Sequence, residues 1–111
     1  GHFAEAVFTA MRAVEIAVRE AGGFQPKQVG TKLMMAAFGQ SGPLRDLEAD
    51  AAEEDGLMHL FVGAMGSYKN PHSHRNVALE DAGEAIEIVM FASHLLRIVN
   101  SRRPLKGNGQ V

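Results

Sequence analysis

The sequence predicts a single all-α domain, an up-and-down bundle of four or five helices. Segments with apolar residues at three- and four-residue steps alternate with short stretches that contain Gly and Pro. With six Phe, one Tyr and no Trp, the core must be built largely from Ala, Val, Leu, Ile and six Met, a set that favours helix over sheet. No segment alternates apolar with polar residues well enough to predict a strand.

Residues 3–21 are predicted to form the first helix. One apolar stripe consists of Phe3, Val7, Met11, Val14, Val18 and Ala21. Glu15 and Arg19 are assigned to the opposite, polar side, where their spacing suits an ion pair. Gly22 and Gly23 are expected to end the helix.

A connector over residues 24–30 leads to a short helix. Thr31 is expected to cap a helix over residues 32–38, which Gly39 closes. Residues 40–43 are a turn and residues 44–55 are interpreted as a loop. The last residues of this loop, Glu53, Glu54 and Asp55, are expected to supply negative charge to the start of the next helix.

The next helix is predicted from about residue 53 to residue 68. Gly56, Gly63 and Gly66 weaken it, and the favoured interpretation is that helices pack closely at these small residues. The alternative is that Gly66 lets the backbone approach a ligand. Asn70-Pro71 is expected to end the helix, because proline disfavours the α conformation at the preceding residue.

Residues 80–100 are predicted to form the longest helix. Its polar strip consists of Glu80, Glu84, Glu87, His94 and Arg97. Apolar residues cover most of the remaining circumference, which is more than one internal core requires. This pattern predicts burial on two sides and therefore a homodimer. Residues 1–101 are expected to be one helical domain, and residues 102–111 a polar, frayed tail.

Composition and charge restrict the classes of function. The chain has no cysteine, which excludes disulfides, thiolate metal sites and cysteine nucleophiles. A net charge of −2 gives the molecule no overall field that attracts nucleic acid. No apolar run approaches the roughly 18 residues that a membrane span needs. We expect a cytoplasmic protein without membrane association, and Gly1-His2 resembles the remnant of a tag on a domain of a longer protein.

An acidic block lies before the second long helix. It consists of Asp46, Glu48, Asp50, Glu53, Glu54 and Asp55. Arg45 is the only cation close to it in the sequence. Such blocks are usually solvated faces, and a solvated face is what we expect here.

The polar stretch over residues 66–75, between two apolar helices, is the candidate site. It contains Lys69, Asn70, His72, His74 and Arg75, with no acidic residue. Histidine can exchange a proton near neutral pH, and a cation can stabilise charge that develops on a phosphoryl group. These residue types suit phosphodiester cleavage without a metal, and they equally suit simple phosphate binding.

Plainer interpretations of the same residues remain open. Asn70-Pro71 alone is an ordinary helix stop, and Lys69 alone is by default a solvated charge. His72 and His74 have the spacing of a metal-binding pair, which His59 or a glutamate would complete. Our prediction nevertheless includes no metal and no cofactor.

The stretch Tyr68-Lys69-Asn70-Pro71-His72-Ser73-His74-Arg75 resembles the motif of the HEPN superfamily, often written Arg-Asn-Pro-x-x-His. Lys69 stands at the arginine position, Asn70 and Pro71 match, and His74 is the histidine. Residues 30–38 and 60–65 also resemble the uncharacterised Ymh branch of that superfamily. Lys69 departs from the family motif, which has arginine at this position. The ammonium group of lysine is a point charge, whereas the planar guanidinium of arginine can donate two hydrogen bonds to one phosphate.

The resemblance implies a helical bundle that dimerises and brings two polar loops together. Many members are RNases in toxin–antitoxin, abortive-infection or anti-phage systems, and others only bind. If the family's motif residues keep their roles at the matching positions, His74 is the general acid/base, Lys69 stabilises the charge on the phosphate, and Asn70 orients the substrate. His72, Arg75 and Tyr68 are assigned as supporting or substrate-binding residues.

The resemblance therefore predicts a metal-independent endoribonuclease that acts as a homodimer on RNA, with an antitoxin or regulatory protein as a further partner. The alternative is an inactive module that binds a nucleotide or RNA, or that serves for dimerisation.

Overall fold

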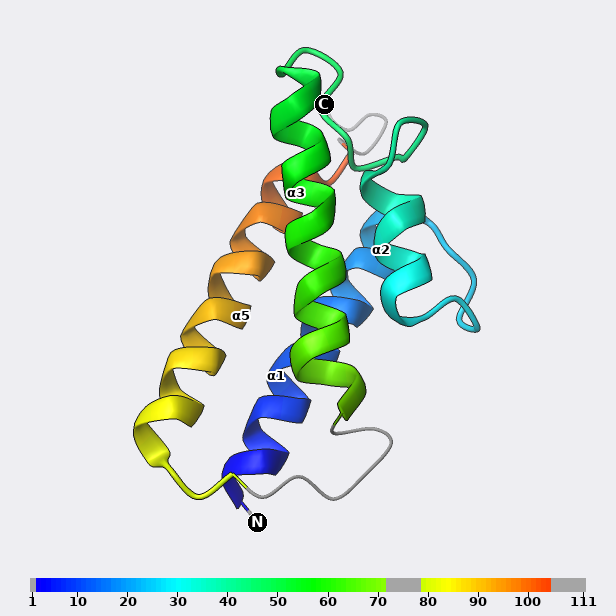
Figure 1. The fold of residues 1–111 in the computed structure, drawn as a ribbon. Coiled ribbons are helices and arrows are strands. Elements are labelled where there is room, and N and C mark those ends of the chain that lie inside the picture. Colours follow the sequence, from blue (N-terminus) through cyan, green and yellow to red (C-terminus); the bar gives the residue numbers. More distant parts are fainter. Residues whose placement is uncertain (1, 72–78, 105–111) are drawn as a thin grey trace.

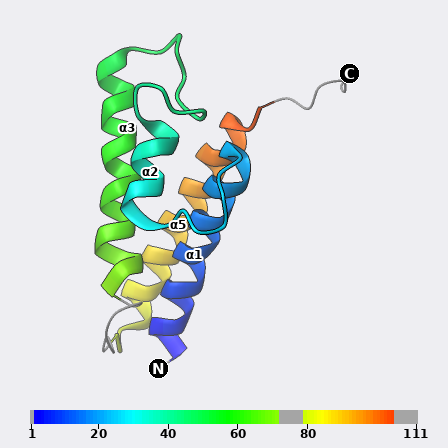
Figure 2. The same cartoon turned by 90° about the vertical axis from the view of Figure 1, so that its right-hand side faces the viewer.

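The computed structural model describes residues 2–71 and 79–104, and within them it contains four helices and no strand. The all-α prediction is confirmed. α1 (His2–Gly22) packs most extensively on α5 (Ala82–Arg102), while the short α2 (Gly30–Phe38) packs on α3 (Ala51–Ala64). α1, α3 and α5 run along the length of the molecule, and α2 covers one side of α3 (Figure 1, Figure 2).

The apolar stripe of α1 forms the centre of the core. Val7, Met11, Val14 and Val18 are completely buried, whereas Phe3 at the start of the stripe is exposed. The predicted ion pair of Glu15 and Arg19 is present, with Nη1 of Arg19 at 3.9 Å from Oε1 of Glu15. Glu15 was assigned to the polar side, and this is wrong: it is 4% exposed.

α2 begins at Gly30, two residues earlier than predicted, so Thr31 is not its N-cap. The N-cap is Val29, whose side chain makes no capping hydrogen bond. Instead, the Glu15 carboxylate of α1 accepts a hydrogen bond from the Gly30 N–H. A residue that is distant in the sequence thus supplies the hydrogen-bond acceptor for a free backbone N–H at the start of the helix. The predicted end is correct, because the Gly39 N–H donates to the Met35 carbonyl.

α3 begins at Ala51, so the final part of the predicted loop is helical. Asp50 is the N-cap, and its carboxylate accepts from the Ala52 N–H at 2.8 Å. Glu53 and Glu54 lie in the first turn, as expected. In the core between α2 and α3, the rings of Phe38 and Phe61 stack at a centroid distance of 4.2 Å.

The glycines of α3 do not mark close helix packing. A Cβ at Gly56 or Gly63 would have no atom of the described residues within 4 Å. At Gly66 it would meet only Cγ2 of Thr31, at an ordinary 3.8 Å. The interpretation as packing positions is therefore wrong for Gly56 and Gly63, whereas Gly66, in η1, lies at contact distance from Thr31 of α2.

The end of α3 departs from the predicted helix stop. Met65–Lys69 forms a π-helical turn, η1, and Asn70 remains in the right-handed helical conformation with φ −64° and ψ −42°. The Asn70 N–H reaches back to the Met65 carbonyl, five residues earlier. This wider turn continues the helical path up to Pro71, which has no N–H to contribute.

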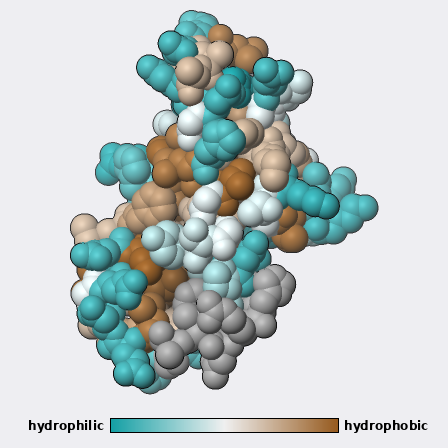
Figure 3. Space-filling view, viewed as in Figure 1, coloured by the Kyte–Doolittle hydropathy of each residue, from teal (hydrophilic) through white to brown (hydrophobic). Residues whose placement is uncertain are grey.

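α5 begins at Ala82, where the Asp81 carboxylate caps the N–H groups of Gly83 and Glu84. Its inner face is buried and consists of Ala85, Ile88, Ala92, Leu95 and Val99. Its outer side carries Ile86, Val89 and Met90, which are 58%, 36% and 66% exposed. Apolar surface is visible over the part of the molecule where α5 and α3 run (Figure 3). α5 therefore has apolar residues both inside and outside the core of this chain.

Two features complete the fold. Arg102 was assigned to a frayed tail, but it belongs to α5 and is paired with Glu54 of α3. No helix in residues 2–71 and 79–104 is long and apolar enough to cross a membrane.

Candidate functional site

The predicted site residues fall into two groups. Tyr68, Lys69 and Asn70 lie in or next to η1 and are described. His72, His74 and Arg75 lie outside the described residues. The structure therefore describes the cationic and amide part of the motif, and the pairing of Lys69 with His74 stays a prediction.

Lys69 points into the protein, onto α1. Its Nζ lies 3.1 Å from Oε2 of Glu15, and its side chain is only 13% exposed. The π turn matters here, because one extra residue per turn rotates every following side chain relative to a regular α-helix. Lys69 is thus a largely buried cation that is fixed by an ion pair with Glu15, and it is not a solvated surface charge.

Glu15 is the centre of this cluster. Besides Lys69, Oε2 accepts from the Gly30 N–H at 2.8 Å, and Oε1 lies 3.9 Å from Nη1 of Arg19. Nη1 of Arg19 also donates to the Gln28 carbonyl in the connector, at 3.2 Å. Among the described residues, two cations therefore contact this one carboxylate.

Asn70 lies close to the same helix start. Its Oδ1 would be 3.9 Å from a Cβ placed on Gly30. Gly30 has a φ of +69°, in the left-handed region that favours glycine. Lys69 and Asn70 therefore both lie next to the first residue of α2, and the motif is joined to the α1–α2 connector.

Tyr68 faces another element. Its ring meets Phe91 of α5 edge-on, with centroids 6.2 Å apart and an interplanar angle of 74°. The side chain is 36% exposed. In this structure Tyr68 packs η1 against α5, which is a structural role that its assignment as a supporting residue did not include.

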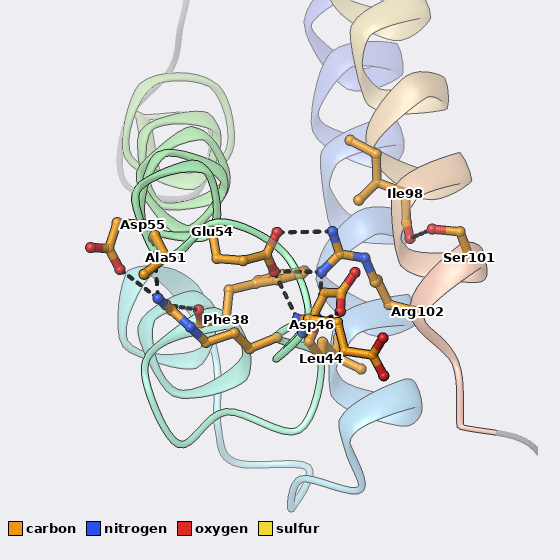
Figure 4. A network of polar contacts seen from close by, with 11 residues as sticks. Phe38, Leu44, Asp46, Ala51, Glu54, Asp55, Ile98, Ser101 and Arg102 are labelled. Carbon is orange, nitrogen blue, oxygen red and sulfur yellow. Dashed lines mark hydrogen bonds and ion pairs between the residues drawn. The ribbon is translucent and has the colours of Figure 1, made fainter.

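A second polar network ties the start of α3 to the end of α5 (Figure 4). The Glu54 carboxylate accepts two hydrogen bonds from Arg102 and one from the Asp46 N–H. Arg45 donates to the Phe38 and Ala51 carbonyls and pairs with Asp55 at 2.9 Å. The acidic block is therefore not simply a solvated face, because Glu54 is buried and has a partner from α5.

The Arg102 hydrogen bonds hold the pKa of Glu54 below its usual value, although burial acts in the opposite direction. The same contact raises the pKa of Arg102. Both groups are therefore charged at neutral pH, and this network has the character of a structural clamp.

Metal ligation finds no support among the described residues. No group of three His, Asp or Glu side chains in that part of the chain is arranged to hold a metal ion. His59, a suggested third ligand, lies exposed on α3, while His72 and His74 are outside the described residues. The His-x-His hypothesis remains untested.

Glu15 is the site residue that sequence reasoning missed. The available signal was its position relative to the apolar stripe: Met11, Glu15 and Val18 follow one another at steps of four and three. An acidic residue at such a position is placed at the edge of a core, where it needs a partner. The sequence does not reveal that the partners come from residues 30 and 69.

The described residues thus define an all-helical protein with a buried, ion-paired lysine at the end of its third helix. Over residues 1–99 the chain matches the family model described as "Protein of unknown function (Hypoth_ymh)", and it belongs to this family. The Ymh part of the resemblance is confirmed. Comparisons with curated proteins and with solved structures give no significant match.

Proposed function

We propose that this protein is a metal-independent endoribonuclease of the toxin or anti-phage defence kind. The observation that carries the proposal is the largely buried, ion-paired cation Lys69 at the π-helical end of α3, five positions before the motif histidine His74 in the sequence. π turns inside helices occur frequently at functional sites. The HEPN-like motif supplies the choice of reaction.

In the proposed reaction, His74 removes the proton of the RNA 2′-hydroxyl. The 2′-oxygen attacks the adjacent phosphorus, the bond to the 5′-oxygen breaks, and the departing oxygen takes up a proton. Lys69 stabilises the negative charge on the phosphoryl oxygens, and Asn70 orients the phosphate. The products are a 2′,3′-cyclic phosphate and a 5′-hydroxyl.

The proposal includes a homodimer whose two motif stretches share one cleft. Ile86, Val89 and Met90 on the outer side of α5 support it, because an exposed apolar surface of this kind is common where subunits meet. An antitoxin or regulatory protein would then control the nuclease.

A second candidate is a non-catalytic module that binds RNA or a nucleotide. The ion pair of Lys69 with Glu15 favours this second candidate. The Glu15 carboxylate lies 3.1 Å from Nζ of Lys69 and compensates much of the positive charge with which Lys69 would stabilise a reacting phosphate. In this case the main role of Lys69 would be to stabilise the fold, and binding of the ligand would be a secondary role.

RNA cleavage in EDTA separates the two candidates. We expect the wild type to cleave RNA to 2′,3′-cyclic phosphate ends, and His74→Ala to lose at least about a hundredfold in rate. His94→Ala, an exposed histidine of α5, is the matched control and should cleave at the wild-type rate. Intact RNA after prolonged incubation, or full activity in His74→Ala, would overturn the nuclease.

The binding module makes a different prediction for the same samples. RNA would raise the melting temperature without being cut, and Lys69→Ala would abolish this shift. A wild type that does not cleave RNA, and that neither RNA nor a nucleotide stabilises, would exclude both candidates.

A further inference from the structure

The Glu15 carboxylate joins three separate parts of the chain. It comes from the middle of α1, accepts the N–H of the first residue of α2, and pairs with the last residue of η1. Its side chain is 5% exposed.

We propose that Glu15 is a positioning residue of the site, which sets the direction of Lys69 and ties it to the start of α2. This inference rests on the proposed function, in which Lys69 acts on a phosphate. Glu15 belongs to none of the motif positions, and it lies 54 positions before Lys69 in the chain.

The first argument is conformational. A lysine side chain has four rotatable bonds and loses more rotamer entropy than most side chains when it is fixed. The buried carboxylate selects one orientation of Lys69 in the folded protein, before any ligand arrives. A ligand that meets an ordered cation does not have to supply that ordering itself.

The second argument is electrostatic. Glu15 alone, at this burial, would be costly as an anion, and Lys69 would be costly as a cation. In the ion pair each charge offsets the burial cost of the other, and Arg19 is a second cation 3.9 Å from the same carboxylate. The pair therefore keeps an ammonium group at the helix end without turning the site negative.

The third argument concerns the shared oxygen. Oε2 of Glu15 accepts from both the Gly30 N–H and the Lys69 ammonium. A shift of either donor changes the best position of the carboxylate for the other. Movement of the α1–α2 connector is thereby coupled to the position of Lys69.

The test compares Glu15→Gln, Lys69→Met and the double variant in single-turnover RNA cleavage at saturating RNA. Glutamine keeps the size of the side chain and an oxygen for Gly30, but it removes the charge. We expect each single variant to lose at least tenfold in rate, and the double variant to lose no more than the worse of the two. Glu20→Gln, an exposed glutamate on the same helix, is the matched control and should be unchanged.

The measurement is made at a temperature where all variants are folded, because a merely stabilising Glu15 would leave the rate of the folded enzyme unchanged. A wild-type rate in Glu15→Gln, or losses that multiply in the double variant, would overturn the inference.

A second measurement decides the inference even if the wild type cleaves no RNA. In a ¹H–¹⁵N NMR spectrum, Lys69→Met should shift the Gly30 amide signal across the shared carboxylate, and Glu20→Gln should leave it in place. An unmoved Gly30 signal in Lys69→Met would refute the coupling. Failure of the nuclease and failure of the positioning role are thus seen in different experiments.

Discussion

The Glu54 carboxylate and the Arg102 guanidinium meet in a two-point ion pair, with oxygen–nitrogen distances of 2.7 Å and 3.1 Å (Figure 4). The two residues are 48 positions apart in the sequence. They connect the first turn of α3 to the last turn of α5. Because α5 otherwise packs mainly on α1, this pair specifically links the α1–α5 helix pair to the α2–α3 helix pair.

Removing the cation of this pair should destabilise the protein. Arg102→Met leaves the Glu54 carboxylate buried without its main partner, and we expect the free energy of unfolding to fall by about 2–4 kcal/mol. The measurement is urea unfolding followed by circular dichroism. Arg103→Met, at the exposed neighbouring position, should change the value by less than about 0.5 kcal/mol. Equal effects of the two substitutions would contradict the clamp.

The same pair predicts a pH dependence. The pKa of Glu54 is lowered in the folded protein, chiefly by the Arg102 hydrogen bonds. The stability that ionised Glu54 contributes is therefore fully present above the pKa of an ordinary, unfolded glutamate, and it is lost as the pH falls through the lower pKa of Glu54 in the folded protein. Between pH 6 and about pH 3, the unfolding free energy of the wild type should fall more steeply than that of Glu54→Gln. Parallel profiles would show that Glu54 does not contribute.

The stacked rings of Phe38 and Phe61 predict the most costly apolar substitution in the contact between α2 and α3. Both side chains are almost completely buried. Phe61→Ala should lower the unfolding free energy by about 3–5 kcal/mol, because it leaves a cavity in a closed core. Phe3→Ala, at a position that is 40% exposed, is the control and should cost clearly less. Chemical denaturation measures both.

Two glycines should respond to alanine in opposite directions. Gly63 is an exposed helical position with open space around its Cα, so Gly63→Ala should stabilise the protein by about 0.5–1 kcal/mol. Gly30 has a φ of +69°, so Gly30→Ala should destabilise it by about 1–2 kcal/mol. Melting curves of the two variants against the wild type give both signs, and a stabilising Gly30→Ala would contradict the left-handed start of α2.

The outer side of α5 can be tested as a dimer surface. If two copies meet there, Ile86→Glu combined with Met90→Glu should convert a dimer to a monomer, because two acidic groups per copy would be brought into an apolar contact. Size-exclusion chromatography with light scattering gives the mass in solution. Met35→Glu, at an exposed apolar position of α2, is the control and should remain dimeric. A wild type that is monomeric at high concentration would rule out the dimer.

Helical periodicity determined much of the fold from the sequence. The stripe of Val7, Met11, Val14 and Val18 predicted α1, and the long apolar pattern after residue 80 predicted α5. These patterns are local, since the residues that form one helix face lie three or four positions apart. The glycine at the end of α2 was predictable for the same reason, because a C-cap depends on the adjacent turn.

The positions of the candidate site could be predicted only in part. The motif identified Lys69 and Asn70 as residues of interest, and both lie together next to Gly30. The sequence placed a helix stop at Asn70-Pro71, whereas the π turn keeps Asn70 helical and continues the helix up to Pro71. The conformational preference of a residue before proline applies to an ordinary α-helix. It does not predict a local change from the α-helical to the π-helical hydrogen-bond pattern.

The sequence alone therefore determined the helical class, most of the helix faces and the motif that suggests phosphate chemistry. Only the tertiary structure decided that Glu15 and Glu54 are buried and which cations they meet. The physical reason is that an acidic residue on a helix face is exposed by default, and a buried charge is tolerated only where a partner satisfies it. For Glu15 that partner is Lys69, from the motif itself, and the contact exists only once α1 and the end of α3 lie side by side.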